Sequence, residues 1–345
     1  MSTIRRILVA VKDTQHLPRN VLRKAAVLAR ASGATIELYH AMLDQLPSLI
    51  GTGPQYEKLE RAYVRRLAAR RHKRLARLAR RAPLRGLTVQ CTAAWDFPAH
   101  EAIIRRALAT RADLVIATVP QRGHGTRWLL AHTDWELIRH CPVPLLLVKS
   151  RRTYRRPVLL AGVDPFHAHA KPSNLDARLL QFGGEMSRRL RGSLHVFHAY
   201  MPLIALVPIA GPGGPVMALP PEAEEEHRIQ ITHAVERLAQ RAAVPRGRCH
   251  VEMGLVASEL QSVVARTRAD IVVMGAVSRS AVKRIIVGNT AERVLDGLRC
   301  DVLIVKPRGF HSGVLRLRPK VVSSERLGRS QVTAPGRSRR TAVAS

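Results

Sequence analysis

The chain has 345 residues, enough for two domains with cores of their own. It carries 57 lysines and arginines against 25 aspartates and glutamates, and a formal charge of +32 attracts polyanions without sequence preference. Its four scattered cysteines form no CxxC pair, which argues against a disulfide framework or a zinc site. The N-terminal MSTIRRILVAV lacks the long apolar region of a signal peptide, so we expect a cytoplasmic protein.

Short apolar runs alternate with helical patterns along the first half. Such alternation predicts βαβ units and a parallel sheet. The predicted strands are 5–12, 35–41, 87–94, 112–118 and 143–149. The predicted helices are 17–32, a long basic helix at 55–81, 98–110, and one through Trp135 and Ile138.

The same order of elements then repeats. RRPVLLAGVDP at 155–165 echoes RRILVAVKDT, and SLHVFHAY at 193–200 echoes TIELYHAM. The clearest match aligns 112–149 with 269–306 without a gap. This is the duplication of a whole domain rather than a solenoid repeat. It predicts domains at 1–150 and 156–307.

Two segments depart from the repeat. Residues 308–345 are basic and show no core-sized periodicity, so we predict a disordered tail whose removal leaves stability nearly unchanged. Residues 201–219 carry no charge, but their prolines and glycines argue against a membrane helix. That segment is a candidate lid, dimer contact or mobile loop.

The stretch 269–307 carries the most chemical information. A buried strand ends at Gly275, a basic loop follows, and Gly288, Asn289 and Thr290 precede a helical pattern. A turn of small residues at a helix N-terminus offers free N–H groups to an anion. The stretch is therefore a candidate phosphate site.

At these residues the chain resembles the universal stress protein family. The motif GNTAERVL, in a chain that contains two such domains, is most similar to the tandem E-type members. Nucleotide-binding members carry three spaced glycines followed by Ser or Thr. Gly275 and Gly288 match the outer glycines, whereas Ser278 stands at the middle one and Asn289 at the Ser/Thr, with Thr290 one place later. The resemblance implies two doubly wound, parallel five-stranded sheets of the adenine-nucleotide α-hydrolase type, which is Rossmann-like. Because members of the family dimerise through their last strand, the resemblance and the duplication together imply that the two domains pack through the strands 143–149 and 301–306.

The resemblance also implies where a nucleotide would bind. Asp164 ends the first strand of the second half, where the family's acid contacts adenosine, although it can also serve as a helix-entry turn residue. Arg279 either pairs with phosphates or belongs to a solvated basic loop. The first half has Thr118, Gln121 and Ala131 at the glycine positions. We therefore expect ATP, with nucleotide-bound Mg²⁺ as the one metal, in the second domain alone.

Histidines and motifs give little support to catalysis. His40 and His198 end equivalent strands, which predicts a shared structural role. His195 and His198 should point to opposite faces of their strand, which disfavours a shared ion. No nucleophile elbow, HExxH or P-loop pattern occurs.

The sequence thus predicts a stress-response protein that is not an enzyme beyond slow ATP hydrolysis. It would bind ATP or another small, apolar ligand, act through protein partners, and could form a homodimer. One alternative is a basic protein that associates with nucleic acid non-specifically through 55–81 and the tail. Another is a nucleotide hydrolase of the same fold.

Overall fold

A computed structural model describes residues 4–15, 17–42, 54–119, 132–166, 174–203, 220–276, 294–295, 297–315 and 321–327. These residues fold around one eleven-stranded sheet with the order β11-β3-β2-β1-β4-β5-β10-β9-β6-β7-β8. The first-half strands are β1 (Arg6–Ala10), β2 (Thr35–Met42), β3 (Val89–Trp95), β4 (Leu114–Thr118) and β5 (Leu145–Val148). The later strands are β6 (Val158–Gly162), β7 (Ser193–Tyr200), β8 (Cys249–Met253), β9 (Ile271–Gly275), β10 (Asp301–Val305) and β11 (Val321–Leu327).

Each half supplies five parallel strands, as the sequence predicted. The halves join where β5 and β10 pair antiparallel, with Leu146 opposite Leu303. These two leucines are equivalent in the internal repeat, so a pseudo-two-fold axis passes between them. The predicted contact through the last strand of each half is confirmed, and it turns two sheets into one.

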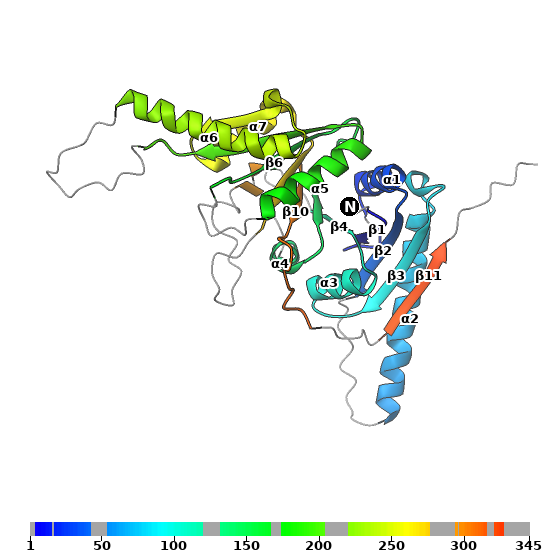
Figure 1. The fold of residues 1–345 in the computed structure, drawn as a ribbon. Helices are drawn as coiled ribbons and strands as arrows, with labels where there is room; N and C mark the ends of the chain where they lie inside the picture. Colours follow the sequence, from blue (N-terminus) through cyan, green and yellow to red (C-terminus); the bar gives the residue numbers. More distant parts are fainter. Residues whose placement is uncertain are drawn as a thin grey trace, which may run out of the picture.

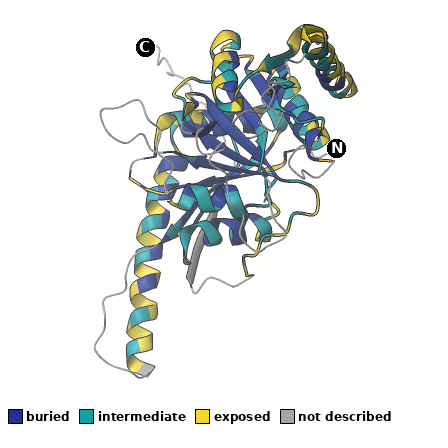
Figure 2. Cartoon of the chain, turned by 90° about the vertical axis from the view of Figure 1, so that its left-hand side faces the viewer, coloured by how far each residue is buried: buried dark blue, intermediate teal, exposed yellow. Residues whose placement is uncertain are grey.

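Helices cover both faces of this sheet (Figure 1). Their bounds are α1 (Arg19–Ser32), α2 (Pro54–Ala79), α3 (Ala99–Ala109), α4 (His132–His140), α5 (Leu175–Arg189), α6 (Pro221–Arg241) and α7 (Val256–Thr267). Apolar residues of α1, α2, α5 and α6 belong to one core cluster, and those of α3, α4 and α7 belong to a second. The central strands lie between these two layers and are buried, whereas the outer faces of the helices are exposed (Figure 2).

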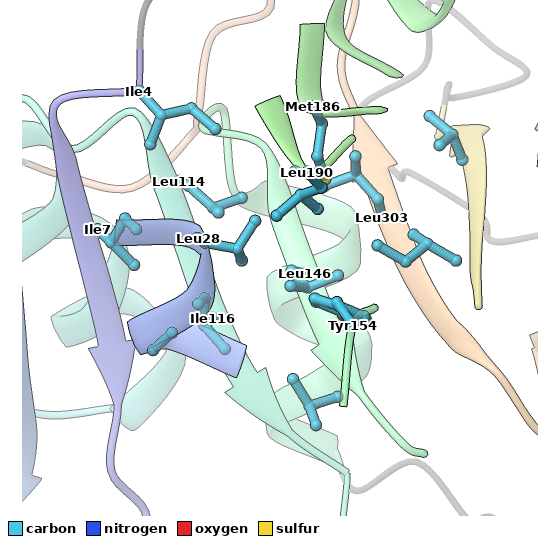
Figure 3. Packing of buried hydrophobic residues seen from close by; sticks show 14 of the residues in the cluster. Ile4, Ile7, Leu28, Leu114, Ile116, Leu146, Tyr154, Met186, Leu190 and Leu303 are labelled. Carbon is cyan, nitrogen blue, oxygen red and sulfur yellow. The ribbon is translucent and has the colours of Figure 1, made fainter. Parts of the chain in front are cut away.

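The first of these core clusters runs without interruption across the join. Leu28 and Leu146 of the first half belong to it together with Met186, Leu190 and Leu303 of the second (Figure 3). All five side chains are at least nine-tenths buried. Apolar burial of this kind is the main favourable term in folding, so the two halves stabilise each other.

Strand β11 corrects the prediction for the basic tail. Residues 321–327 form a strand that pairs antiparallel with β3, from Val321 opposite Trp95 to Leu327 opposite Val89. The expectation of a tail without regular structure is therefore wrong for this segment, which extends the sheet beyond the first half. Strand β8, the equivalent of β3, pairs with β7 on one side and has no second neighbour among the described strands.

The uncharged segment 201–219 lies outside the described residues apart from 201–203, so its predicted roles stay open. In the part of the chain that the structure covers, no helix is long and apolar enough to cross a membrane.

Candidate functional site

The candidate site lies where two neighbouring parallel strands of the second half end. β6 lies between β7 and β9, so the chain leaves it toward one side of the sheet and reaches β9 on the other. Ligands of open α/β sheets bind at such a switch point, beyond the carboxyl ends of the strands. Asp164 follows β6 and Gly275 ends β9, and the pairing of Ala161 with Val273 brings both to the same edge. The structure thus brings these two predicted site residues together.

The loop that carries Asp164 is fixed by its backbone. The N–H of Asp164 donates to both carboxylate oxygens of the buried Asp176 in the first turn of α5, at 3.3 Å each. The carbonyl of Val163 lies 2.9 Å from Nδ1 of His198, and the Val163 N–H donates to Phe197. These contacts hold the half-buried Asp164 at the strand end, where a carboxylate accepts hydrogen bonds from hydroxyl groups.

Packing explains in part why position 275 holds a glycine. A Cβ at this position would lie 2.6 Å from Cδ2 of Leu175, the first residue of α5. A larger residue would push the Leu175 side chain aside. Gly275 therefore leaves room for Leu175 to pack against the strand end, whatever the glycine contacts in a ligand.

The remaining predicted contacts cannot be placed. They are Ser278, Arg279, Gly288, Asn289 and Thr290, and all five lie outside the described residues.

The equivalent edge of the first half carries the opposite charge. Val11 matches Val163, because its carbonyl lies 2.8 Å from Nδ1 of His40 and its N–H donates to the next strand. Lys12 therefore occupies the position of Asp164. Its Nζ lies 2.6 Å from Oδ1 of Asp134, which is fully buried in the first turn of α4. The first half thus replaces a carboxylate acceptor with an internal ion pair.

Sequence reasoning missed Phe166. Its side chain is 53% exposed beside the Asp164 loop, and its ring centroid lies 6.3 Å from that of His198. An exposed aromatic ring at a switch point offers a stacking surface for a planar ligand. The signal was present in the sequence, since the chain has five phenylalanines and this one follows Asp164-Pro165 directly.

The histidines divide into two groups. His40 and His198 make the same bond to the carbonyl that follows the first strand of their half, which confirms their shared structural role. His195 stacks on His250 of β8, with Nδ1 and Nε2 3.0 Å apart. Burial, and then the charges of His250 and Arg248, lower the pKa of His195 to about 4. Among the described residues, no group of three or more His, Cys, Asp or Glu side chains is placed to hold a metal ion.

Comparison with known proteins agrees with this architecture. The model of the universal stress protein family matches the chain twice, at residues 3–149 and 159–306. The chain belongs to this family. It is a tandem member of the E type: it is 28% identical to universal stress protein E of Escherichia coli K12 over 238 residues, which cover 66% of this chain and 72% of that protein. The Haemophilus influenzae homologue is 25% identical over 229 residues, or 64% and 71% of the two chains.

Solved structures show the same fold. A functionally unknown protein of Pseudomonas aeruginosa, PA1789, superposes with a TM-score of 0.63 at 22% identity, over 88% of this chain and 93% of its own. A universal stress protein of Archaeoglobus fulgidus gives a TM-score of 0.56 at 14% identity, over 88% and 99% of the two chains. At these identities the likeness concerns the fold alone.

Proposed function

We propose that this universal stress protein binds an adenine nucleotide in its second half only, and that it responds to stress through protein partners in the cytoplasm rather than by catalysis. The observation that carries the proposal is the contrast at one structural position. The second switch point has the carboxylate of Asp164 beside a strand that ends in glycine and beside Phe166. The first switch point has Lys12, whose ammonium is bound to Asp134.

The proposed contacts follow from the chemistry of each group. Asp164 accepts hydrogen bonds from the ribose hydroxyls, and Phe166 supports the base. The phosphates lie against the segment of Ser278, Gly288, Asn289 and Thr290, with Arg279 neutralising charge. Mg²⁺ accompanies the phosphates. We expect hydrolysis to be slow at most, since the sequence contains no nucleophile-elbow, HExxH or P-loop pattern.

Calorimetric titration of Mg-ATP tests this proposal. Gly288→Val fills the space beside the phosphates and should abolish binding, whereas Ala131→Val, the matched change in the first half, should leave it unchanged. Asp164→Ala should weaken binding about tenfold, which corresponds to one lost hydrogen bond to a charged group. Equal losses from the two valine variants would refute a single site. No heat with wild type at about millimolar ATP would reject the nucleotide and leave a small apolar ligand as the alternative.

A second candidate function rests on α2. The N-terminal part of this helix projects from the body of the protein (Figures 1 and 2). Its exposed basic residues are Lys58, Arg61, Arg65, Arg66, Arg70, Lys73 and Arg77. Of these, Arg61 pairs with Glu57 at 2.8 Å, and the others have no carboxylate partner among the described residues. A row of such cations is suited to a nucleic-acid backbone.

The salt dependence of binding distinguishes a nucleic-acid surface on α2 from non-specific attraction to the net positive charge of the protein. Changing Arg65, Arg66 and Arg70 to glutamine should weaken binding to single-stranded DNA and reduce the salt slope by about 2. The control changes Arg241, Arg246 and Arg248, which removes equal charge from exposed positions in the second half. If both triple variants lose the same affinity, the helix is not a binding surface.

A further inference from the structure

The pseudo-two-fold axis creates two junctions between the halves, and these have diverged. In one, α1 of the first half meets the start of β10. In the other, α5 of the second half meets the start of β5. The helices align at their C-terminal turns, where Ala34 N–H donates to Ala29 and Gly192 N–H donates to Ser187. By this alignment Phe182 is the counterpart of Lys24, and by the strand pairing Pro144 is the counterpart of Asp301.

The junction at α1 is closed by buried charges. Lys24 Nζ lies 2.5 Å from Oδ2 of Asp301 and 2.7 Å from the carbonyl of Ser150. The Tyr154 hydroxyl donates to the same carboxylate oxygen at 2.5 Å, and the N–H groups of Lys149 and Ser150 donate to Oδ1. Lys24 and Asp301 are fully buried. One carboxylate from the second half thus neutralises the cation of the first.

The junction at α5 is open instead. A cavity of about 490 Å³ lies between α5, the turn before β5 and the segment after β10, lined by Phe182, Pro144, Arg178 and Arg308 among others. Its volume falls within the range of small-molecule sites, roughly 300–1,000 Å³. Neither Asp164 nor Gly275 lines it, so this cavity is distinct from the nucleotide site proposed above.

The two arginines that line this cavity do not pair with the two carboxylates that also line it. Burial, and then the positive charge of Arg308, lower the pKa of the half-buried Arg178. Two carboxylates line the cavity, but both are already engaged. Asp113 accepts the backbone N–H groups of Arg5 and Arg6 at 2.8 and 2.9 Å, and Glu185 accepts Arg189 at 2.9 Å. Within the described residues, neither Arg178 nor Arg308 has an ion-pair partner.

We propose that the α5 junction binds a small phosphate-bearing molecule, whose anion takes the place that Asp301 fills in the α1 junction. Two guanidinium groups at one cavity suit a phosphate because each can donate in bidentate geometry. Phe182 and Pro144 offer an apolar wall to the organic part of the ligand. Since the walls come from both halves, the bound molecule stabilises their contact.

Inorganic phosphate is the probe, and the full chain is titrated by thermal unfolding against chloride of equal ionic strength. The melting temperature of wild type should rise with phosphate and saturate. Arg178→Gln should raise the half-saturating concentration about tenfold, since it removes one charge-assisted contact. Arg308→Gln should act in the same direction, and because Arg308 is exposed, this variant keeps the test valid if the Arg178 variant unfolds.

Two controls decide the outcome. Arg188→Gln removes an equal charge from an exposed position on the same helix and should respond like wild type. Gly288→Val, which should block the phosphate position of the proposed nucleotide site, should also respond like wild type, and this separates the cavity from that site. If all three arginine variants respond alike, or if wild type does not respond to phosphate, the proposal is overturned. Loss of the response in Gly288→Val alone would move the phosphate to the nucleotide site and equally overturn the proposal.

Discussion

The two halves share their strands, their order and the histidine that fixes the first loop, yet they differ at the two places where a ligand or partner could bind. At the switch point the first half has Lys12 bound to a buried Asp134, and the second half has Asp164. At the junctions the first half supplies a buried Lys24 that meets Asp301, and the second supplies Phe182 beside a cavity. At both places a lysine of the first half forms an ion pair within the molecule, and the second half has no equivalent of that ion pair among its described residues. Duplication thus allows one copy to carry ion pairs that stabilise the molecule, while the other keeps the positions that we propose as ligand sites.

The largest expected loss of stability comes from removing the buried ion pair of the α1 junction. Asp301→Ala leaves the Lys24 ammonium buried without its carboxylate and should lower the free energy of unfolding by about 3–5 kcal/mol. Adding Lys24→Met to the same chain should recover part of the lost stability, because it removes the unpaired buried ammonium. Urea unfolding measures both. The exposed Asp13→Asn serves as control, and a loss equal to that of the control would show that the junction does not depend on the pair.

Breaking the ion pair at the first switch point should come next. Lys12→Ala leaves Asp134 buried without its ammonium partner and should cost about 2–3 kcal/mol of unfolding free energy. Asp164→Ala, at the equivalent position, should cost little stability because its side chain is half-exposed. Thermal and urea unfolding compare the two. Similar stability losses would contradict the assignment of a structural role to one position and a binding role to the other.

Strand β11 covers the outer edge of the first half, and the equivalent edge of the second half has no such strand among the described residues. Its removal should lower the stability of the protein moderately. Truncation after residue 315 frees the edge of β3, whose N–H and C=O groups can then bind water. The free energy of unfolding should therefore fall by roughly 1–2 kcal/mol, or a few degrees in melting temperature. Truncation after residue 327 removes further tail but retains β11 and is the matched control. Equal melting temperatures for the two truncated chains would show that β11 adds no stability.

The smallest expected effect concerns the stacked pair of His195 and His250, which lies in the second half. The pKa of both rings is lowered, chiefly by burial, and that of His195 falls to about 4. Between about pH 4 and 6.5 the unfolded chain therefore binds more protons than the folded one, so stability falls as the pH is lowered through this window. His195→Gln should reduce the drop in melting temperature between pH 7.5 and 5 by a few degrees at most. His233→Gln, at an exposed position, is the control, and an identical acid response in the two variants would contradict the assignment.

Much of the fold could be predicted from local patterns. Buried parallel strands are continuous apolar runs, so LVIAT at β4 and IVVMG at β9 were recognisable in the sequence. The gapless repeat of 112–149 at 269–306, together with the resemblance to the family, predicted that the last strands would meet, and β5 pairs with β10. Strand β11 was not predictable in this way, because VVSSERL is short and mixed in character. Its pairing with β3 joins segments that are distant in the sequence.

The candidate site was predictable only in part. Asp164 and Gly275 were singled out because each lies at the end of a predicted strand and because the resemblance to the family points to both positions. Phe166 was missed, since an exposed ring in a loop has no periodic signal. The role of Lys12 was also missed, because its partner Asp134 lies 122 residues away in the sequence.

By itself the sequence determined the duplicated parallel architecture and the family, because these depend on apolar periodicity and on residues at matching positions. The tertiary structure alone decided which charges are neutralised. Lys24 and Asp301 are 277 residues apart, and only the packing of both halves around β5 and β10 brings them into a buried contact. The same packing leaves Arg178 and Arg308 at an open cavity, since Pro144 stands where a carboxylate closes the other junction. Burial sets the energetic importance of such charges, and burial is a property of the folded chain.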